Sequence, residues 1–190
     1  HERLSIVHLQ QLSAITGHPI KAATRDNHRA NLQIIFTDES RLAKYLRADM
    51  QLSHRRLQTL SRNSVCIAHF TVNQRSEIIK AVVVIPVDRA RAHAKLLACI
   101  VEELTQIMGL PNDDTSVFPS IFNDRSHDNF LSGLDYILLK LLYQPALKSG
   151  MNAPQSRSAI KKIMQRPAFQ QWLQQADKEV RARGLYPLLE

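Results

Sequence analysis

The residues with the clearest chemical pattern lie between positions 102 and 112. Glu102 and Gln106 are four positions apart, so on a helix they project from one face. Glu103 stands between them, and Gly109 and Asn112 follow. These side chains offer only oxygen donors, which suit zinc poorly and a hard cation such as Mg²⁺ weakly. They therefore allow four interpretations: a solvated helix face, a hydrogen-bonded structural cluster, a binding cleft without chemistry, or a site for an atypical divalent metal.

The element that must position these residues is an amphipathic helix, predicted from about Arg89 to Met108. Its apolar stripe comprises Leu97, Ile100, Val101, Leu104, Ile107 and Met108. Gly109 and Pro111 are typical residues to end it. Among the other elements, the pattern predicts strands over residues 31–37, 64–72 and 78–85 and helices over 2–16 and 131–143, with a long structured loop over 111–130. It also predicts one basic helical segment over 157–183.

The spacing from Glu102 to Asn112 is that of the zinc-protease pattern H-E-x-x-H-x-x-G-x-x-H. Glu102, Gln106 and Asn112 occupy its three ligand positions. Glu103 keeps the position of the general base, and Gly109 keeps the turn toward the third ligand. The spacing matches throughout, whereas the ligand identities do not.

Two later segments extend this resemblance. Ser120-Ile121-Phe122 resembles the Met-bearing turn of metzincin proteases, with Phe122 in place of the Met. Residues 131–143 are similar to the closing helix of matrixin-like enzymes. Together the motifs resemble an uncharacterised bacterial family of zincin-like domains over roughly residues 5–152. His127, in the loop after Phe122, is placed either to fold back over the cleft or to lie on the surface.

The resemblance implies an α+β zincin-like fold, in which a mixed sheet packs on the central helix. It implies a degenerate protease that binds a peptide, a protein or an envelope component in its cleft and needs no cofactor. The alternative is an active peptidase, with Glu103 as general base and an atypical divalent metal held by Glu102, Gln106 and Asn112. Members of that family are exported proteins or lipoproteins, so we expect a periplasmic or membrane-anchored protein whose export signal is not in this chain.

The two cysteines bear on the expected export of the protein. Cys66 lies in a predicted strand and Cys99 in the predicted central helix. In a zincin-like fold the sheet packs on that helix, so the resemblance brings the two within reach of each other. Two buried free thiols are the alternative. The implied export favours a disulfide between Cys66 and Cys99 in an oxidising compartment.

Composition and the absence of further motifs exclude several classes of protein. The chain of 190 residues is 44% apolar and 22% charged, which is typical of a folded domain, and no apolar run reaches the roughly 20 residues of a membrane-spanning helix. No nucleophile elbow, P-loop or G-x-G-x-x-G motif is present. We therefore expect neither a serine hydrolase nor a nucleotide-binding enzyme.

The net charge of +8 is unevenly distributed. A boundary rich in Pro and Gly divides the sequence into a zincin-like domain, 1–152, and a basic helical extension, 153–190. Five of the eight net positive charges lie within 148–190. The extension carries no nucleic-acid-binding motif, so an acidic partner or an anionic membrane surface is the expected contact, with an ordinary solvated basic helix as the alternative.

Overall fold

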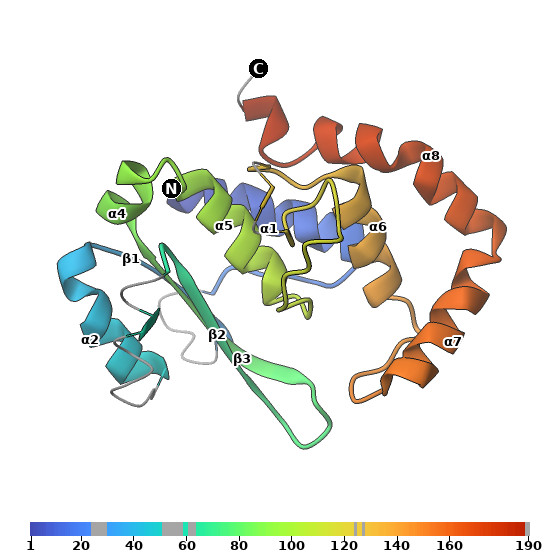
Figure 1. Ribbon diagram of the computed structural model, residues 1–190, viewed down its shortest axis with the longest axis horizontal. Helices are drawn as coiled ribbons and strands as arrows, with labels where there is room; N and C mark the ends of the chain where they lie inside the picture. Colours follow the sequence, from blue (N-terminus) through green and yellow to red (C-terminus); the bar gives the residue numbers. More distant parts are fainter. Residues whose placement is uncertain (24–29, 51–58, 61–63, 124, 127, 189–190) are drawn as a thin grey trace. The chain divides into compact units, whose positions relative to one another are not determined.

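The computed structural model describes residues 1–23, 30–50, 59–60, 64–123, 125–126 and 128–188 (Figure 1). The chain forms two compact units. Unit 1 comprises His1–Lys21, Gln74–Glu77 and Asn112–Glu190, and unit 2 comprises Ala22–Asn73 and Ile78–Pro111. The described residues form an α+β protein with one small mixed sheet, which agrees with the α+β class that the resemblance implies.

Unit 2 contains a mixed sheet of three strands in the order β1-β3-β2. The strands are β1 (Leu32–Thr37), β2 (Ile67–Val72) and β3 (Ile78–Pro86). Strand β3 pairs in parallel with β1 and antiparallel with β2. Its residues 81–86 are all buried, because β3 is the central strand and helices also pack against it.

Helix α2 (Glu39–Met50) packs against β3. Its Leu42 and Leu46 are buried, and they share one apolar cluster with Ile35, Ile67, Val82 and Val84 of the three strands. The spacing of four between the two leucines gives α2 a single apolar face toward the sheet.

The single helix predicted from Arg89 to Met108 is wrong. The segment forms two helices, α4 (Val87–Ala92) and α5 (Leu96–Gln106), separated by His93, Ala94 and Lys95. Ala94 has a φ of 53°, its N–H donates to the Arg91 carbonyl, and the Lys95 N–H donates to the Ala90 carbonyl. These two hydrogen bonds form a Schellman motif, which ends α4 without the usual glycine.

Unit 1 is helical. It contains α1 (Glu2–Thr16), α6 (Gly133–Leu142), α7 (Ala153–Met164), α8 (Pro167–Ala182) and the short 3₁₀ helix η1 (Tyr186–Leu188). Helix α6 packs against both α1 and α8. Among the described residues, none of the helices of either unit combines the length and the hydropathy that a membrane span requires.

The last two helices differ from the single helical segment predicted over 157–183. Helix α7 begins earlier, at a capping box in which Asn152 and Gln155 exchange hydrogen bonds. It ends at Met164, and Pro167 starts α8, because proline lacks the N–H that a continuing helix needs. The domain boundary at 152/153 stays a prediction, since unit 1 groups α7 and α8 with α1 and α6.

Contacts distant in the sequence close unit 1. The buried Gln11 of α1 donates through Nε2 to the carbonyls of Val180 and Arg183, each at 3.2 Å. The ring of Tyr186 in η1 stacks on Phe130 with centroids 4.6 Å apart. Unit 1 therefore joins the first and last helices of the described chain.

Candidate functional site

Helix α5 carries three of the predicted site residues. Glu102 and Gln106 lie on one face and are half-buried, whereas Glu103 is only 7% exposed. The apolar neighbours Ile100, Val101 and Leu104 are fully or almost fully buried. These leucine, isoleucine and valine side chains fix the rotation of α5, and so determine where the carboxylates and the amide lie.

The chain turns sharply after α5. The N–H groups of Gly109 and Leu110 both donate to the Gln106 carbonyl, and Gly109 has a φ of 118°. That conformation strongly favours glycine, in agreement with the turn predicted at this position. Asn112 is exposed and begins the last segment of unit 1.

A disulfide joins Cys66 to Cys99, with the two Cα atoms 5.8 Å apart. The predicted pairing is confirmed, and the free-thiol alternative is wrong. Cys99 lies in α5, and Cys66 immediately precedes β2. Because α5 also packs against β2 and β3, the bond fixes the helix of Glu102 and Gln106 beside the edge strand β2.

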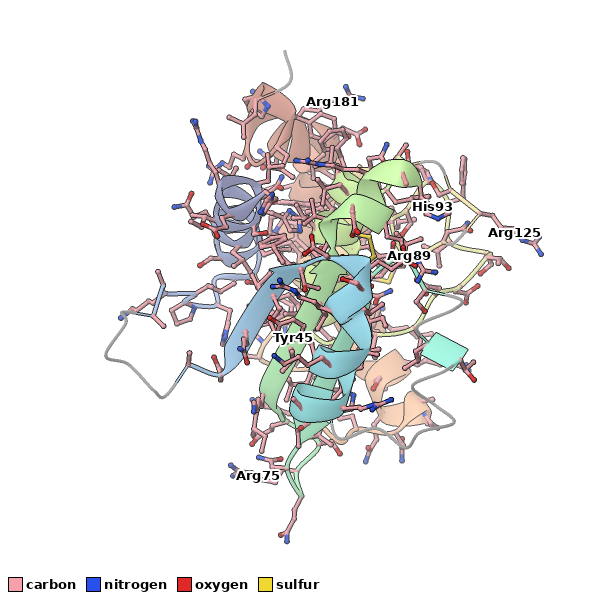
Figure 2. The ribbon with its side chains drawn as sticks, turned by 90° about the vertical axis from the view of Figure 1, so that its left-hand side faces the viewer. Tyr45, Arg75, Arg89, His93, Arg125 and Arg181 are labelled. Carbon is pink, nitrogen blue, oxygen red and sulfur yellow. A yellow bond between two sulfur atoms is a disulfide. The ribbon has the colours of Figure 1, made fainter. Side chains whose placement is uncertain are left out.

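His93 lies outside the helix of Glu102. We expected both residues on one helix, but His93 follows α4, beside which Figure 2 labels it. The Schellman motif at Ala94 separates the two helices. Within the described ranges, no three His, Cys, Asp or Glu side chains gather as a metal site would require, and His127 lies outside those ranges.

The Ser120–Phe122 turn belongs to unit 1 and is held by α6. Asp135, in the first turn of α6, is fully buried. Its carboxylate accepts hydrogen bonds from the Ser120 hydroxyl at 2.5 Å and from the Ile121 N–H at 3.2 Å. Phe122 is buried, and its N–H donates to the Ser120 Oγ. The turn is therefore a fixed element, with Phe122 directed into the core.

Asp135 also caps its own helix. It accepts from the N–H and the hydroxyl of Ser132, which itself accepts from the Asp135 N–H. Burial raises the pKa of Asp135, against the lowering effect of its hydrogen bonds to Ser120, Ser132 and Ile121. We did not predict this residue, although Ser132-x-x-Asp135 has the spacing of a capping box.

The loop before the turn is also internally bonded. The Asn123 side chain donates to the carbonyls of Thr115 and Val117, and the Asp114 N–H donates to the Phe122 carbonyl. The predicted structured loop is therefore confirmed over its described residues. Phe118, by contrast, is 72% exposed.

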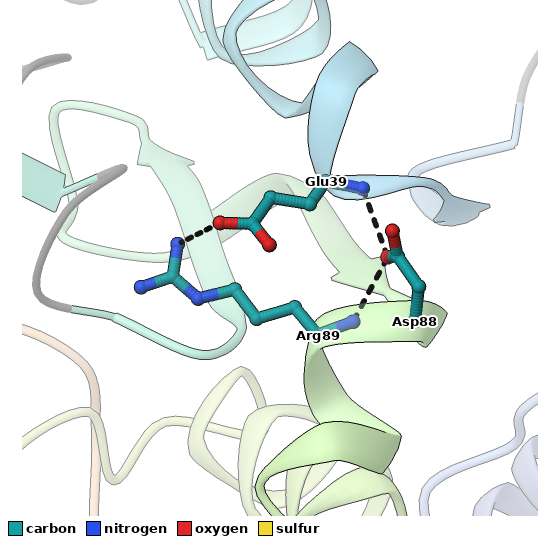
Figure 3. A network of polar contacts seen from close by, with 3 residues as sticks. All are labelled: Glu39, Asp88 and Arg89. Atoms are coloured by element: carbon teal, nitrogen blue, oxygen red, sulfur yellow. Dashed lines mark hydrogen bonds and ion pairs between the residues drawn. The ribbon is translucent and has the colours of Figure 1, made fainter.

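A second polar network lies at the carboxyl ends of β1 and β3 in unit 2 (Figure 3). Asp88 Oδ1 accepts from the N–H groups of Glu39 and Arg89, both at 2.9 Å. The Arg89 guanidinium, 11% exposed, lies 3.4 Å from the Glu39 carboxylate. Asp88 thus satisfies a free N–H at the start of α2, so we assign this network a structural role.

Comparison with known proteins gives a family. Residues 1–162 match DUF2927, a family described as proteins of unknown function. Neither the curated proteins nor the solved structures gave a match. The matched range includes α5, the disulfide and the Ser120–Phe122 turn, and it ends within α7. The chain therefore belongs to the DUF2927 family.

Proposed function

We propose that this chain is a zincin-like domain that lacks zinc ligands and binds an extended peptide or a protein partner along β2 without hydrolysing it. The observation that supports this most is the juxtaposition of α5 with β2. The helix with zinc-protease spacing packs against an edge strand and is disulfide-bonded to the residue before that strand.

The donor set of α5 favours binding over catalysis. Glu102 and Gln106 replace the two histidines that a zinc protease presents from one helix face. A carboxylate and a neutral amide hold zinc poorly, so no Lewis acid is expected beside Glu103. Glu103 is also buried, so its side chain is part of the packed face of α5.

Strand β2 has the form of a peptide-binding edge. In the sheet formed by the described residues, β2 pairs with β3 on one side and no strand lies on the other. Extended peptides add to such an edge through main-chain hydrogen bonds, a mode that needs no metal. The exposed side chains of Thr71 and Val72 lie at the end of this strand and would contact an added peptide.

We further propose that the protein works outside the cytoplasm, in the periplasm or at the membrane as an exported protein. The Cys66–Cys99 disulfide supports this, because such bonds persist in oxidising compartments and are rare in the cytosol.

Metal analysis separates this proposal from an active peptidase. The purified chain is equilibrated with zinc and desalted, and its metal content is measured by mass spectrometry. We expect no stoichiometric zinc. One zinc per chain that is lost in Glu102→Ala and Gln106→Ala, but kept in the exposed control Glu2→Ala, would overturn the proposal. So would peptidase activity that Glu103→Gln abolishes.

Hydrogen exchange tests the binding mode. Peptides selected from a random library on the immobilised chain are added in excess, and amide protection is compared strand by strand. We expect added protection in Ile67–Val72 and none in Leu32–Thr37, the edge strand on the other side of β3. A library that yields no binder, or protection confined to residues outside β2, contradicts peptide addition.

A further inference from the structure

A long segment of unit 1 carries cations and no carboxylate. From Tyr136 to Ala176 the sequence contains no Asp or Glu, but six basic residues: Lys140, Lys148, Arg157, Lys161, Lys162 and Arg166. Lys140 is half-buried, with its Nζ over the rings of Tyr136 and Trp172. The other five are exposed, and none takes part in the ion pairs found among the described residues.

Helix α7 gathers part of this charge on one face. Arg157, Lys161 and Met164 are spaced by four and three positions, so they follow one another along the same side of the helix. All three are exposed, and Met164 is 45% exposed. Ile163, about a quarter turn or more away, is fully buried and fixes the opposite side of α7 toward the core.

An exposed apolar side chain beside cations on one helix face is a feature of helices that lie in a membrane interface. The methionine would enter the acyl boundary, while the flanking cations meet lipid phosphates. We propose that this face of α7, formed by Arg157, Lys161 and Met164, binds an anionic phospholipid surface. The proposal uses neither β2 nor α5, so it stands or falls separately from the proposed function.

The aromatic residues nearby argue against nucleic acid as the ligand. Single strands bind to exposed aromatic rings on which the bases stack. Phe169 is buried, and Trp172 packs edge-on against it at 6.1 Å between centroids, with Lys140 over its ring. Neither ring of α8 is therefore open for a base, which leaves charge and apolar insertion as the means of contact.

The test measures partition of the full chain onto vesicles. Phosphatidylcholine vesicles are compared with vesicles that also contain phosphatidylglycerol, by sedimentation. We expect binding only to the anionic vesicles. Arg157→Gln with Lys161→Gln should lower the partition coefficient by about 30-fold, since each cation near an anionic surface contributes about fivefold. The matched control is Lys44→Gln with Arg47→Gln, which removes two exposed cations from α2.

The apolar part is tested by Met164→Gln, with Ile6→Gln as its control because Ile6 is an exposed apolar residue of α1. We expect the first variant to weaken binding severalfold and the second to leave it unchanged. If the double variant of α7 and the double control variant of α2 lose vesicle binding equally, net charge alone drives binding, and the proposal is overturned. No binding to anionic vesicles, with tight binding to polyglutamate, would overturn it in favour of an acidic protein partner.

Discussion

Asp135 is the residue on which the loop before α6 depends. It is fully buried and accepts hydrogen bonds from Ser120, Ile121 and Ser132, so it joins the Ser120–Phe122 turn to the first turn of α6. The acceptor oxygens of this carboxylate are therefore satisfied by hydrogen-bond donors and, among the described residues, not by an ion pair. Its burial nevertheless disfavours the charged form, and this is why its pKa is raised.

The raised pKa predicts a component of stability that depends on pH. In the folded state Asp135 holds its proton to a higher pH than the ordinary 3.8 of the unfolded chain. Its contribution to the unfolding free energy is therefore fully present below 3.8 and is lost as pH rises through the folded pKa. Asp135→Asn keeps the shape and most acceptors but cannot titrate. We expect the stability of Asp135→Asn relative to the native chain to increase across this window.

The measurement is urea unfolding of both chains at a series of pH values. The same measurement on Asp38→Asn, at an exposed carboxylate, serves as the matched control. If the difference between the native chain and Asp135→Asn stays constant with pH, or changes in the opposite sense, the assignment is wrong.

Gly184 is the second position where one residue decides local structure. It has a φ of 73°, and an added Cβ would overlap the side-chain amide of Gln11. That amide donates to two carbonyls at the end of α8, so Gly184→Ala would strain the backbone and also displace a buried hydrogen-bonded group.

We expect Gly184→Ala to cost roughly 2–4 kcal/mol in the free energy of unfolding. Gly17→Ala is a matched control, because Gly17 also has a φ of 73° and a Cβ there meets nothing within 4 Å. It should cost only about 1–2 kcal/mol, the backbone part alone. Equal losses on thermal unfolding would show that Gln11 contributes nothing at this site.

At the scale of elements, the strands and α6 were predictable and the breaks between helices were not. Alternating or continuous apolar runs identify the three strands, and helical spacing identifies α1 and α6. The break between α4 and α5 has no such signal, because a Schellman motif with alanine at Ala94 lacks the glycine that marks it. Pro167 does mark the start of α8, but the apolar spacing continues across it.

The candidate site, too, was predictable from the sequence only in part. Spacing alone places Glu102 and Gln106 on one helix face, and the resemblance brought Cys66 near Cys99. Asp135 was not predicted, because the function of a buried carboxylate depends on donors fifteen and fourteen positions away, Ser120 and Ile121, which no local pattern connects to it. Only its local bond to Ser132 could be inferred from sequence.

The end of α4 gives a prediction of its own. Ala94 has a φ of 53°, which costs an alanine about 1 kcal/mol relative to glycine. Ala94→Gly should therefore raise the unfolding free energy by roughly 0.5–1 kcal/mol. Ala92→Gly, at the last residue of α4, should not raise it and should lower it slightly, since glycine has a lower helix propensity than alanine. Two changes of the same sign on urea unfolding would contradict the Schellman motif.

At the scale of the molecule, the two units are interleaved along the chain, and unit 1 is assembled from three separate segments. Helices α7 and α8 lie in the predicted extension, yet Phe169, Ala176 and Val180 are buried within unit 1. Net charge and composition identify this segment in the sequence. They do not report that its apolar residues complete a core begun by α1 and α6.

We therefore predict that a chain ending at residue 152 is strongly destabilised. It would lose the α8 contacts of α6 and the two acceptors of Gln11, and it would expose their buried apolar surface. The expected result is a large loss of helical circular dichroism beyond that of the deleted residues, or a melting temperature lower by about 10 °C or more. A truncated chain that melts like the intact one would show that the extension is an independent appendage.

The hydrogen bonds from Gln11 to Val180 and Arg183 span 169 and 172 residues of sequence. During synthesis, α1 emerges from the ribosome long before its partner exists. At 5–20 residues per second, the wait is on the order of ten to thirty seconds. Throughout that interval the side-chain amide of Gln11 has neither of the two carbonyls to which it donates in the folded protein. The hydrogen bonds that join α1 to the end of α8 are therefore among the last contacts of unit 1 that can form.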